Sequence, residues 1–299
     1  MSHILVIGGA GYIGSRLVDS LRNDGYNVSI VDLCLYGGQA DYVADYNKLS
    51  AGVISEFDVV ILLAAHPSVQ TCEADPEGSW KNNVGNFRGL LSKLRKDQLL
   101  IYASSGSLLQ GNTKNFGEDQ PFHSPLNNYD MQKQVIEMLA QRSDKYTIGL
   151  RFGTVCGYSY NPRLELMVNS MYMDAKATGT ISISNKNKHR AILGLGDLTK
   201  ALKAILSHPA PPGGIYNLCS FDRSIGQIAE GIGDYKIIEG PDSKTYDFNM
   251  FINKFKSTFD WQPEETIQSI CAELDLIPEH KRDKSKYNRS TNLFKYEVS

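Results

Sequence analysis

A tyrosine and a lysine four residues apart are the clearest candidates for chemistry in this chain. Tyr129 and Lys133 fall in a stretch with helical spacing, and residues i and i+4 of a helix share one face. A lysine beside a tyrosine hydroxyl favours the phenolate, so the pair predicts a general base for an alcohol hydroxyl. Val135, Met138 and Leu139 fall on roughly the opposite face, which we expect to pack on the sheet and so leave the Tyr–Lys pair free to face a cleft. The spacing alone is also typical of an exposed helix pair.

A serine follows a predicted strand at 98–103. Ser105 lies just beyond this run and upstream of Tyr129. A hydroxyl at the carboxyl end of a central strand can hydrogen-bond a reacting oxygen, although serine there also commonly caps a loop.

A glycine-rich turn lies near the start of the chain. The apolar run at 4–7 predicts a buried strand, and Gly8, Gly11 and Gly14 follow it at regular spacing. From Ile13 on, apolar residues recur at helical spacing. Strand, glycine turn and helix in this order form a phosphate-binding corner, because glycine lets the backbone approach a pyrophosphate and the helix supplies N–H groups.

An acidic residue ends the second predicted strand, at 28–32. Asp32 follows Gly14 at close to the separation of about 20 residues expected for a carboxylate that holds an adenosine ribose. The next residue, Leu33, is not basic, so a ribose 2′-phosphate would meet a carboxylate without a cation beside it. The pattern predicts a dinucleotide site that prefers NAD to NADP.

The first half of the chain alternates predicted strands and helices, an order typical of a parallel sheet with helices on both faces. We expect a doubly wound Rossmann-type NAD-binding domain over 1–157 and a smaller C-terminal lobe, mainly substrate-binding, over 158–280. Residues 281–299 are predicted to form a solvated tail. The expected strands are 3–7, 28–32, 42–45, 58–64, 98–103 and 146–151, and the expected helices are 12–24, about 76–96 and 128–142.

Composition limits the class of protein. The 299 residues have a formal net charge of −2, which favours neither nucleic acid nor an anionic membrane as partner. The five cysteines form no C-x-x-C pair and are typical of reduced thiols in a cytoplasmic protein. The apolar run at 59–65 is far shorter than the about 20 residues of a membrane span. We expect no signal peptide and no metal site.

The glycine turn, the acid, the serine and the Tyr–Lys pair together resemble the extended short-chain dehydrogenase/reductases, in particular the NAD-dependent nucleotide-sugar epimerase/dehydratase family and its UDP-glucose 4-epimerase-like members. The resemblance covers about 3–220. It implies that Ser105, Tyr129 and Lys133 are catalytic. The cofactor contacts that it implies are Gly8, Gly11, Tyr12, Ile13, Gly14, Asp32, Asp45, Tyr46, Leu63, Ala64, Ala65, Asn83, Tyr129 and Lys133.

The same resemblance extends to the substrate and to assembly. The segment 189–197 is similar to one whose arginine, here Arg190, clamps a substrate diphosphate, a role that suits the bidentate guanidinium. Asn169 is a second substrate contact that the resemblance implies. An isologous homodimer through the helices near 76–96 and 128–142 is also expected, with Ile136 and Ala140 available for the contact.

The segment after the catalytic strand departs from the family. Its sequence at 104–111 is one residue longer than usual and lacks an aromatic, so Ser104 and Ser107 remain alternatives to Ser105. Gly106 and Ser107 replace the acid pair of the 4,6-dehydratases and the glutamate of decarboxylating relatives, and no cysteine suits 3,5-epimerisation.

These departures leave epimerisation or one-way ketosugar reduction of a nucleotide-diphosphate sugar, and the NAD preference predicted from Asp32 favours C4 epimerisation. In this interpretation Tyr129 takes the C4 hydroxyl proton, hydride moves to NAD, and it returns to the other face of a transient 4-keto sugar. The alternatives are an NAD(P)H-dependent nucleotide-4-ketosugar reductase, an atypical nucleotide-sugar dehydratase and a non-catalytic Rossmann-type cofactor sensor. The Tyr129–Lys133 pair argues against the sensor, which has no need of it.

Overall fold

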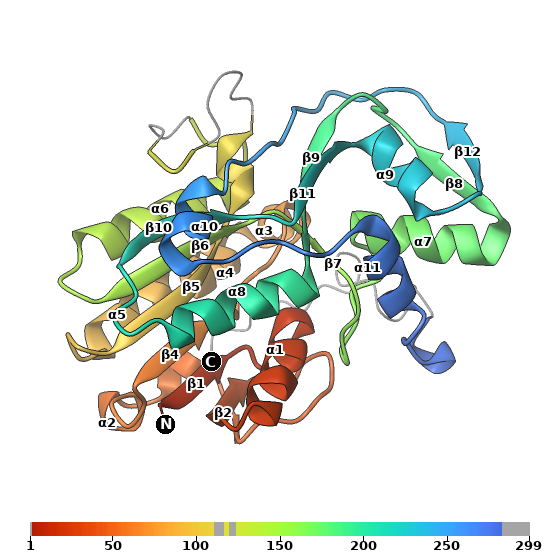
Figure 1. Ribbon diagram of the computed structural model, residues 1–299. Helices are drawn as coiled ribbons and strands as arrows, with labels where there is room; N and C mark the ends of the chain where they lie inside the picture. Colours follow the sequence, from red (N-terminus) through yellow and green to blue (C-terminus); the bar gives the residue numbers. More distant parts are fainter. Residues whose placement is uncertain (1, 111–116, 120–123, 283–299) are drawn as a thin grey trace.

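A seven-stranded parallel sheet forms the centre of the molecule (Figure 1). The structure is a computed structural model, and it describes residues 2–110, 117–119 and 124–282. The strand order is β10-β6-β5-β4-β1-β2-β3. The strands are β1 (His3–Ile7), β2 (Asn27–Asp32), β3 (Tyr42–Val43), β4 (Val59–Leu62), β5 (Leu99–Ser105), β6 (Thr147–Phe152) and β10 (Gly214–Leu218).

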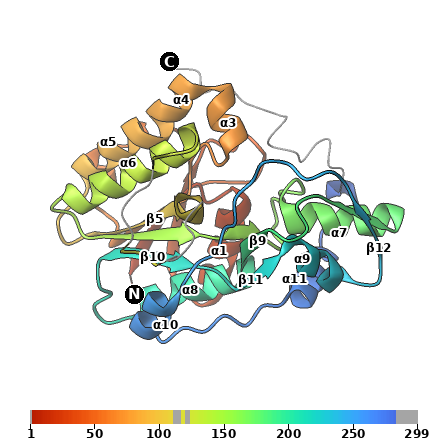
Figure 2. The same cartoon turned by 90° about the horizontal axis from the view of Figure 1, so that it is seen from above.

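Helices cover both faces of this sheet, because the central strands carry apolar side chains on both faces. Ile4 of β1 faces a cluster formed with α1, α8 and α10, whereas Leu5 faces a cluster formed with α2, α5 and α6 (Figure 2). The predicted doubly wound α/β fold is confirmed. The helices are α1 (Tyr12–Asn23), α2 (Ala51–Ile54), α3 (Val69–Ala74), α4 (Pro76–Trp80), α5 (Asn86–Lys93), α6 (Asn128–Arg142), α8 (Leu195–Ser207) and α10 (Asn253–Phe259).

A smaller lobe lies at one end of the sheet (Figure 1). It has its own apolar core, in which Val168, Ile228 and Ile270 are fully buried. Because β10, α8 and α10 return to the main sheet, the segment 158–280 is shared between the two units. The lobe contains β7 (Thr154–Cys156), β9 (His189–Gly194) and β11 (Phe221–Ser224) in one sheet, β8 (Thr180–Ile183) and β12 (Lys236–Glu239) in another, and α7 (Met167–Thr178), α9 (Ile225–Ile232) and α11 (Ile267–Leu274).

The predicted first-half elements agree with the observed ones to within three residues, with one exception, and the short helices α2 and α3 were not predicted. The single helix expected near 76–96 consists of α4, a π-helical turn (Lys81–Gly85) and α5. The predicted tail at 281–299 lies almost wholly outside the described residues.

The orientation predicted for α6 is wrong for Ile136, Ala140 and Met138, whereas Val135 and Leu139 are partly buried against the core as expected. Ile136 and Ala140, expected on an outer face, are buried in the core against the sheet and α5. Met138, expected to pack inward, is 46% exposed. The helical stripe that contains Tyr129 and Lys133 also contains Ile136 and Ala140, and this stripe itself faces the sheet. Tyr129 and Lys133 therefore lie on the inner side of α6, and Ile136 and Ala140 are unavailable for a dimer contact.

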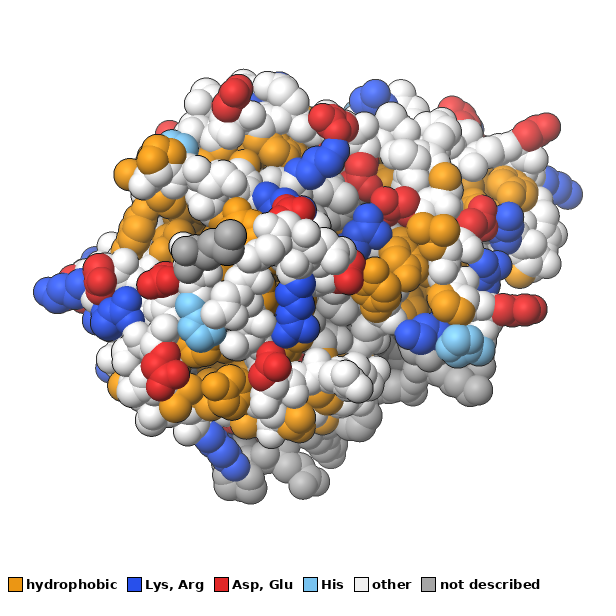
Figure 3. All heavy atoms as spheres, turned by 60° about the horizontal axis from the view of Figure 1, so that its bottom comes forward, with side chains coloured by type: hydrophobic (Ala, Val, Ile, Leu, Met, Phe, Trp, Pro, Cys, Tyr) orange, Lys and Arg blue, Asp and Glu red, His pale blue; other side chains and the backbone are white. Residues whose placement is uncertain are grey.

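Charges of both signs are scattered over the surface. Figure 3 shows Lys and Arg side chains interspersed with Asp and Glu on the face that it draws. Within the described residues, no helix is long and apolar enough to cross a membrane. The same residues contain no group of three or more His, Cys, Asp or Glu side chains placed to hold a metal ion. All five cysteines are free.

Candidate active site

The turn between β1 and α1 is built so tightly that only glycine fits at two of its positions. Gly8 has a φ of 87°, and a Cβ there would lie 2.6 Å from the backbone nitrogen of Ala64. A Cβ on Gly14 would lie 2.2 Å from the carbonyl oxygen of Gly8. Among the described residues, no side chain caps the amino end of α1 at Gly11. The helix therefore presents uncapped N–H groups and its positive dipole end, which suits an anionic pyrophosphate.

Asp32 lies at this same turn. Its Oδ2 accepts a hydrogen bond from the Ala10 N–H at 3.0 Å, and its Oδ1 accepts one from the Cys34 N–H at 2.8 Å. A carboxylate offers about four acceptor sites, so both oxygens retain capacity for ribose hydroxyls. A cavity of about 550 Å³ opens beside the turn, with Ala10, Gly37 and Gly38 in its wall.

A second, small cavity of about 10 Å³ lies beside the carboxyl ends of β4 and β5. Its lining brings together six of the side chains assigned to the cofactor, namely Tyr46, Leu63, Ala64, Ala65, Asn83 and Lys133. Asp45 is not part of this lining, and its Oδ1 instead accepts from the Asn47 N–H at 2.8 Å to cap a short 3₁₀ helix.

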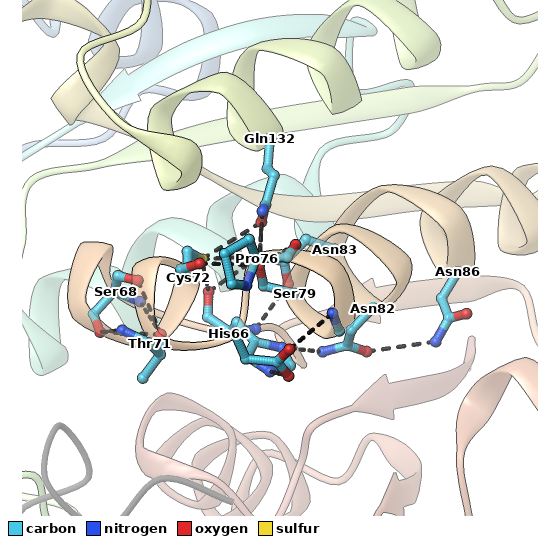
Figure 4. Close-up of polar contacts among 12 residues, drawn as sticks. His66, Ser68, Thr71, Cys72, Pro76, Ser79, Asn82, Asn83, Asn86 and Gln132 are labelled. Atoms are coloured by element: carbon cyan, nitrogen blue, oxygen red, sulfur yellow. Dashed lines mark hydrogen bonds and ion pairs between the residues drawn. The ribbon is translucent and has the colours of Figure 1, made fainter. Parts of the chain in front are cut away.

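Asn83 joins the loop after β4 to the catalytic helix (Figure 4). Its Oδ1 accepts from the His66 N–H at 2.7 Å, and its Nδ2 donates to Gln132 Oε1 at 2.6 Å. Gln132 in turn donates to Ser79 Oγ at 2.8 Å. Asn83 lies in the π-helical turn, an irregularity found frequently at functional sites. Gln132 could not be identified from the sequence, because a polar residue inside a helix does not reveal a buried partner.

The structure separates the three candidate serines. Ser105, at the end of β5, lies close enough to Tyr129 for its hydroxyl to lower the pKa of the phenol. Ser104 points to the opposite side, where its hydroxyl donates to the Glu137 carboxylate. Glu137 forms a buried ion pair with Arg151 at 2.7 Å, so Ser104 belongs to a buried polar cluster with these two residues. The geometry thus brings Ser105 and Tyr129 together, and Ser107 joins them through a 2.8 Å contact between its Oγ and that of Ser105.

The electrostatics of the Tyr–Lys pair differ from the expectation. Burial raises the pKa of Tyr129 to about 12, and the neighbouring Ser105 hydroxyl only partly offsets this rise. Burial also lowers the pKa of Lys133 to about 8. The Lys133 Nζ donates to the Ala103 carbonyl at 2.6 Å and lies 5.7 Å from the centroid of the Tyr129 ring. The predicted depression of the Tyr129 pKa by Lys133 is therefore wrong, since desolvation dominates.

Tyr12 and Asn169 connect the glycine turn to the smaller lobe. The Tyr12 hydroxyl donates to the Gly157 carbonyl at 2.9 Å and accepts from Asn169 Nδ2 at 3.1 Å. Asn169 is fully buried, and its amide also donates to the Arg163 carbonyl and accepts from the Gly157 N–H. Both donors of the Asn169 amide are thus used within the protein. Its contact with substrate stays a prediction that requires one of these bonds to be exchanged.

Two arginines lie on the substrate side. Arg190, on β9, donates from Nη1 to the Tyr246 carbonyl at 2.8 Å and from Nη2 to Thr245 Oγ1 at 2.9 Å, which ties the strand to a later segment. Arg163 pairs with Glu165 at 2.8 Å, and its charge lowers the pKa of Tyr129. Sequence reasoning missed Arg163, because nothing in the loop around it indicates that it approaches the catalytic tyrosine.

Comparison with known proteins identifies the family. A model described as the NAD dependent epimerase/dehydratase family matches residues 4–219. The chain belongs to this family, and NAD is its cofactor. The residues present fit NAD: an uncapped helix end and a glycine turn face the pyrophosphate position, with Asp32 at the turn and Lys133 at the cavity below.

Individual relatives include epimerases and a dehydratase. A putative UDP-glucose 4-epimerase of Methanocaldococcus jannaschii is 29% identical over 219 residues, which are 66% of this chain and 71% of the relative. The structure of UDP-glucuronic acid 4-epimerase from Bacillus cereus, in complex with UDP-glucuronic acid and NAD, has a TM-score of 0.78 at 20% identity, over 91% of this chain and 98% of that one. The NAD-dependent NDP-hexosamine 5,6-dehydratase TunA has a TM-score of 0.81 at 19% identity, over 95% and 100%.

Proposed function

We propose that this protein is an NAD-dependent C4 epimerase of a nucleotide-diphosphate sugar, acting through a transient 4-keto sugar. The observation that carries the proposal is the proximity of Ser105, Tyr129 and Lys133 at the carboxyl end of β5, where the Ser105 hydroxyl lowers the pKa of Tyr129 and Lys133 donates to the Ala103 carbonyl. Two hydroxyls that meet at one point can hold and deprotonate one sugar hydroxyl. The phosphate-binding turn at the same edge of the sheet supports hydride chemistry at that point.

Each residue has a separate role in this proposal. Ser105 orients the C4 oxygen, and Tyr129 takes its proton as general base. Bound NAD supplies a hydride acceptor that becomes the donor for the return step. Lys133, held by the Ala103 carbonyl, would reach the cofactor ribose from the cavity lining. The contact between Asn83 and Gln132 keeps the catalytic helix in register with the loop after β4.

The smaller lobe, mainly 158–280, would bind the substrate. Arg190 is the proposed clamp for the diphosphate, because an arginine fork matches phosphate oxygens. Its present partners are two carbonyls and a hydroxyl. Among the described residues, no carboxylate therefore contacts its guanidinium directly. Arg163 brings a second positive charge near Tyr129 and favours a substrate with polar groups around C4.

The enzyme is further proposed to act in the cytoplasm as a homodimer. Five free cysteines are typical of a reducing compartment. The outer faces of α4 and α6 leave two large apolar side chains, Trp80 and Met138, 41% and 46% exposed. These replace the buried Ile136 and Ala140 as candidates for an isologous contact.

A second candidate function is an atypical dehydratase. One observation favours it: a buried carboxylate, Asp130, contacts Ser107 although the sequence places no acid directly after the catalytic serine. Elimination of water requires such an acid or base beside the sugar. A stable keto-deoxy product would identify this reaction.

Incubation with nucleotide sugars tests the proposal. Purified protein is mixed with UDP-, GDP-, CDP- and dTDP-sugars, and the products are analysed by NMR. We expect one nucleotide sugar to give a mixture of C4 epimers without added reductant, and Tyr129→Phe to give none. Stoichiometric consumption of NADH or NADPH with a 4-keto sugar would replace the epimerase by a reductase.

A further inference from the structure

Two carboxyl groups join the smaller lobe to a helix of the main sheet. Asp197 lies in the first turn of α8 and is fully buried. Its Oδ1 accepts a hydrogen bond from the Glu264 N–H at 2.9 Å, and its Oδ2 accepts one from the Glu265 N–H at 3.0 Å. Glu265 Oε2 in return accepts from the Asp197 N–H at 2.6 Å. These reciprocal hydrogen bonds form what we call the Asp197–Glu265 joint.

The joint lies where the chain passes from one unit to the other. Trp261 packs in the core of the main sheet, and Ile267, the first residue of α11, packs in the core of the smaller lobe. α8 belongs to the main core through Leu198 (Figure 1). Glu273 of α11 also pairs with Arg16 of α1 at 2.8 Å. The joint therefore fastens a helix of the main unit to the segment that leads into α11.

Two glycines leave room for the Glu265 carboxyl group. A Cβ on Gly194 would lie 2.1 Å from Glu265 Oε2, and a Cβ on Gly196 would lie 2.9 Å from the carboxyl carbon of Glu265. Gly194 precedes α8 and has no side chain with which to cap it, so Glu265 caps the helix from a distant segment. With a larger residue at Gly194 the carboxyl could not occupy this position.

The surroundings of Glu265 disfavour a charge on its carboxyl group. Burial raises the pKa of Glu265 to about 7, and the charges of Asp197 and Glu273 act in the same direction. The hydrogen bond from the Asp197 N–H and the charge of Arg16 oppose the rise. A carboxyl with this pKa is half ionised at neutral pH, so its charge changes within the physiological range.

Further groups that face Glu265 come from α8 and β7. Lys200 of α8 pairs with Glu264, which raises its pKa, and Glu265 adds to that rise. Burial raises the pKa of the Cys156 thiol of β7, and so does the charge of Glu265. Lys200 thus stays charged and the thiol stays neutral near pH 7. Neither of them changes its charge in the range where Glu265 does.

We propose that the Asp197–Glu265 joint is a pH-sensitive contact between the two units, closed when the Glu265 carboxyl is protonated and open when it is ionised. A neutral carboxyl still accepts from the Asp197 N–H and places no second charge beside the Asp197 carboxylate. An ionised carboxyl leaves the space at Gly194 and Gly196 for water, and the amino end of α8 loses its cap. The step is an exchange of one proton between the Glu265 carboxyl and solvent.

Acid closes the joint and alkali opens it. In the open form Glu265 meets water and titrates near its ordinary pKa of 4.5, whereas in the closed form its pKa is about 7. The closed form therefore binds the proton more tightly, and its advantage, fully present below pH 4.5, is lost as the pH rises through 7. The ratio of closed to open forms should fall by up to about 300-fold over this window, of which about eightfold lies between pH 6 and 7.5.

The joint bears on substrate binding through β9. This strand carries Arg190, the proposed clamp for the diphosphate, and ends at Gly194 beside the Glu265 carboxyl. Opening of the joint frees that end of the strand, so the clamp is less well placed at alkaline pH. This consequence rests on the proposed function, whereas the joint itself does not.

Amide hydrogen exchange tests the joint directly, because the Asp197 N–H donates to Glu265. Peptides that contain Asp197 and Glu265 are followed by mass spectrometry in the full chain at pH 6 and 7.5, and each rate is divided by the intrinsic rate at that pH. In the wild type the protection of these amides should fall about eightfold from pH 6 to 7.5. Glu265→Gln keeps the shape and the acceptor but has no proton to lose, so its protection should stay high at both pH values.

Two variants complete the exchange experiment. Glu264→Gln changes the neighbouring carboxyl, which is exposed and pairs with Lys200, and this matched control should keep the wild-type fall. Gly194→Ala places a Cβ where the Glu265 carboxyl lies and should give low protection at both pH values. A Glu265→Gln protein whose protection falls as in the wild type would overturn the proposal.

Steady-state kinetics separates the joint from the proposed function. In the wild type the KM for the nucleotide sugar should rise as the pH increases through 7, while in Glu265→Gln this rise should be absent. A wild type that converts no nucleotide sugar, yet shows the expected exchange pattern, would contradict the proposed function and support the joint. Wild-type protection that is equal at pH 6 and 7.5 would contradict the joint, whatever the activity.

Discussion

Replacement of Gly14 by alanine tests the cofactor corner at the point where the structure is tightest. The added Cβ would lie 2.2 Å from the Gly8 carbonyl oxygen and 2.6 Å from the Gly9 Cα. Ordinary contact begins at 3.4 Å, so the first of these separations is short by about 1.2 Å. Both neighbours are backbone atoms, and no rotation of a side chain can relieve the overlap. The amino end of α1 must therefore move away from the turn.

The magnitude of the effect follows from that displacement. Overpacking of this kind costs about 1–3 kcal/mol of unfolding free energy, which lowers the melting temperature by about 2–12 °C. A helix end displaced by about 1 Å loses at least one charge-assisted hydrogen bond to the pyrophosphate, worth about 1.5–3 kcal/mol. The dissociation constant for NAD should therefore rise at least about tenfold.

Calorimetric titration with NAD and thermal unfolding measure the two effects. Gly85→Ala is the matched control, because Gly85 is helical and a Cβ there meets nothing within 4 Å in the described part of the chain. Alanine should leave NAD affinity unchanged there and stabilise the helix by up to about 1 kcal/mol. A Gly14→Ala protein with wild-type NAD affinity and melting temperature would refute the reasoning about the turn.

Four further predictions concern individual residues and assembly. Tyr129→Phe should lower turnover at least about 100-fold while NAD affinity, measured by calorimetry, stays the same; near-normal turnover would remove its role as base. Asp32→Ala should weaken NAD more than NADP in parallel titrations, and a wild type that prefers NADP would contradict the assignment. Arg190→Ala should raise KM for the nucleotide sugar and spare NAD affinity, so an unchanged KM leaves the clamp unsupported. Sedimentation should give a dimer at micromolar concentration, and a monomer would count against the contact at Trp80 and Met138.

The cofactor corner could be predicted from the sequence because its signal is local. The glycine spacing, the flanking strand and helix and the position of Asp32 lie within one continuous segment, and the structure places Asp32 at the turn. The parallel sheet followed in the same way from alternating strands and helices. Such elements depend on neighbours along the chain, which the sequence displays directly.

The orientation of α6 could not be predicted, because it depends on what the helix packs against. The assumption that Tyr129 and Lys133 face an open cleft placed Ile136 and Ala140 outside, whereas the sheet covers that whole stripe. The same burial raises the pKa of Tyr129 instead of lowering it. Desolvation arises from distant segments, so no local spacing reveals it.

The polar contacts between residues of the site also could not be predicted from the sequence. Ser104, Ser105 and Ser107 are chemically alike, and only the register of β5 against its neighbours decides which hydroxyl meets Tyr129. Asp130 stands next to Tyr129 in the chain, yet its contact with Ser107 depends on the 3₁₀ turn after β5. Gln132 acquires its role only through Asn83, far earlier in the chain.

The central claim is a reversible oxidation at C4 within a single site, and isotope retention tests it most directly. The substrate is the nucleotide sugar identified in the product screen, deuterated at C4, and turnover takes place in ordinary water. The account predicts inverted product that keeps its deuterium at C4, with no lasting accumulation of reduced nicotinamide, because the hydride returns to the sugar from which it came. Inverted product that has exchanged its C4 deuterium for solvent hydrogen would contradict the account.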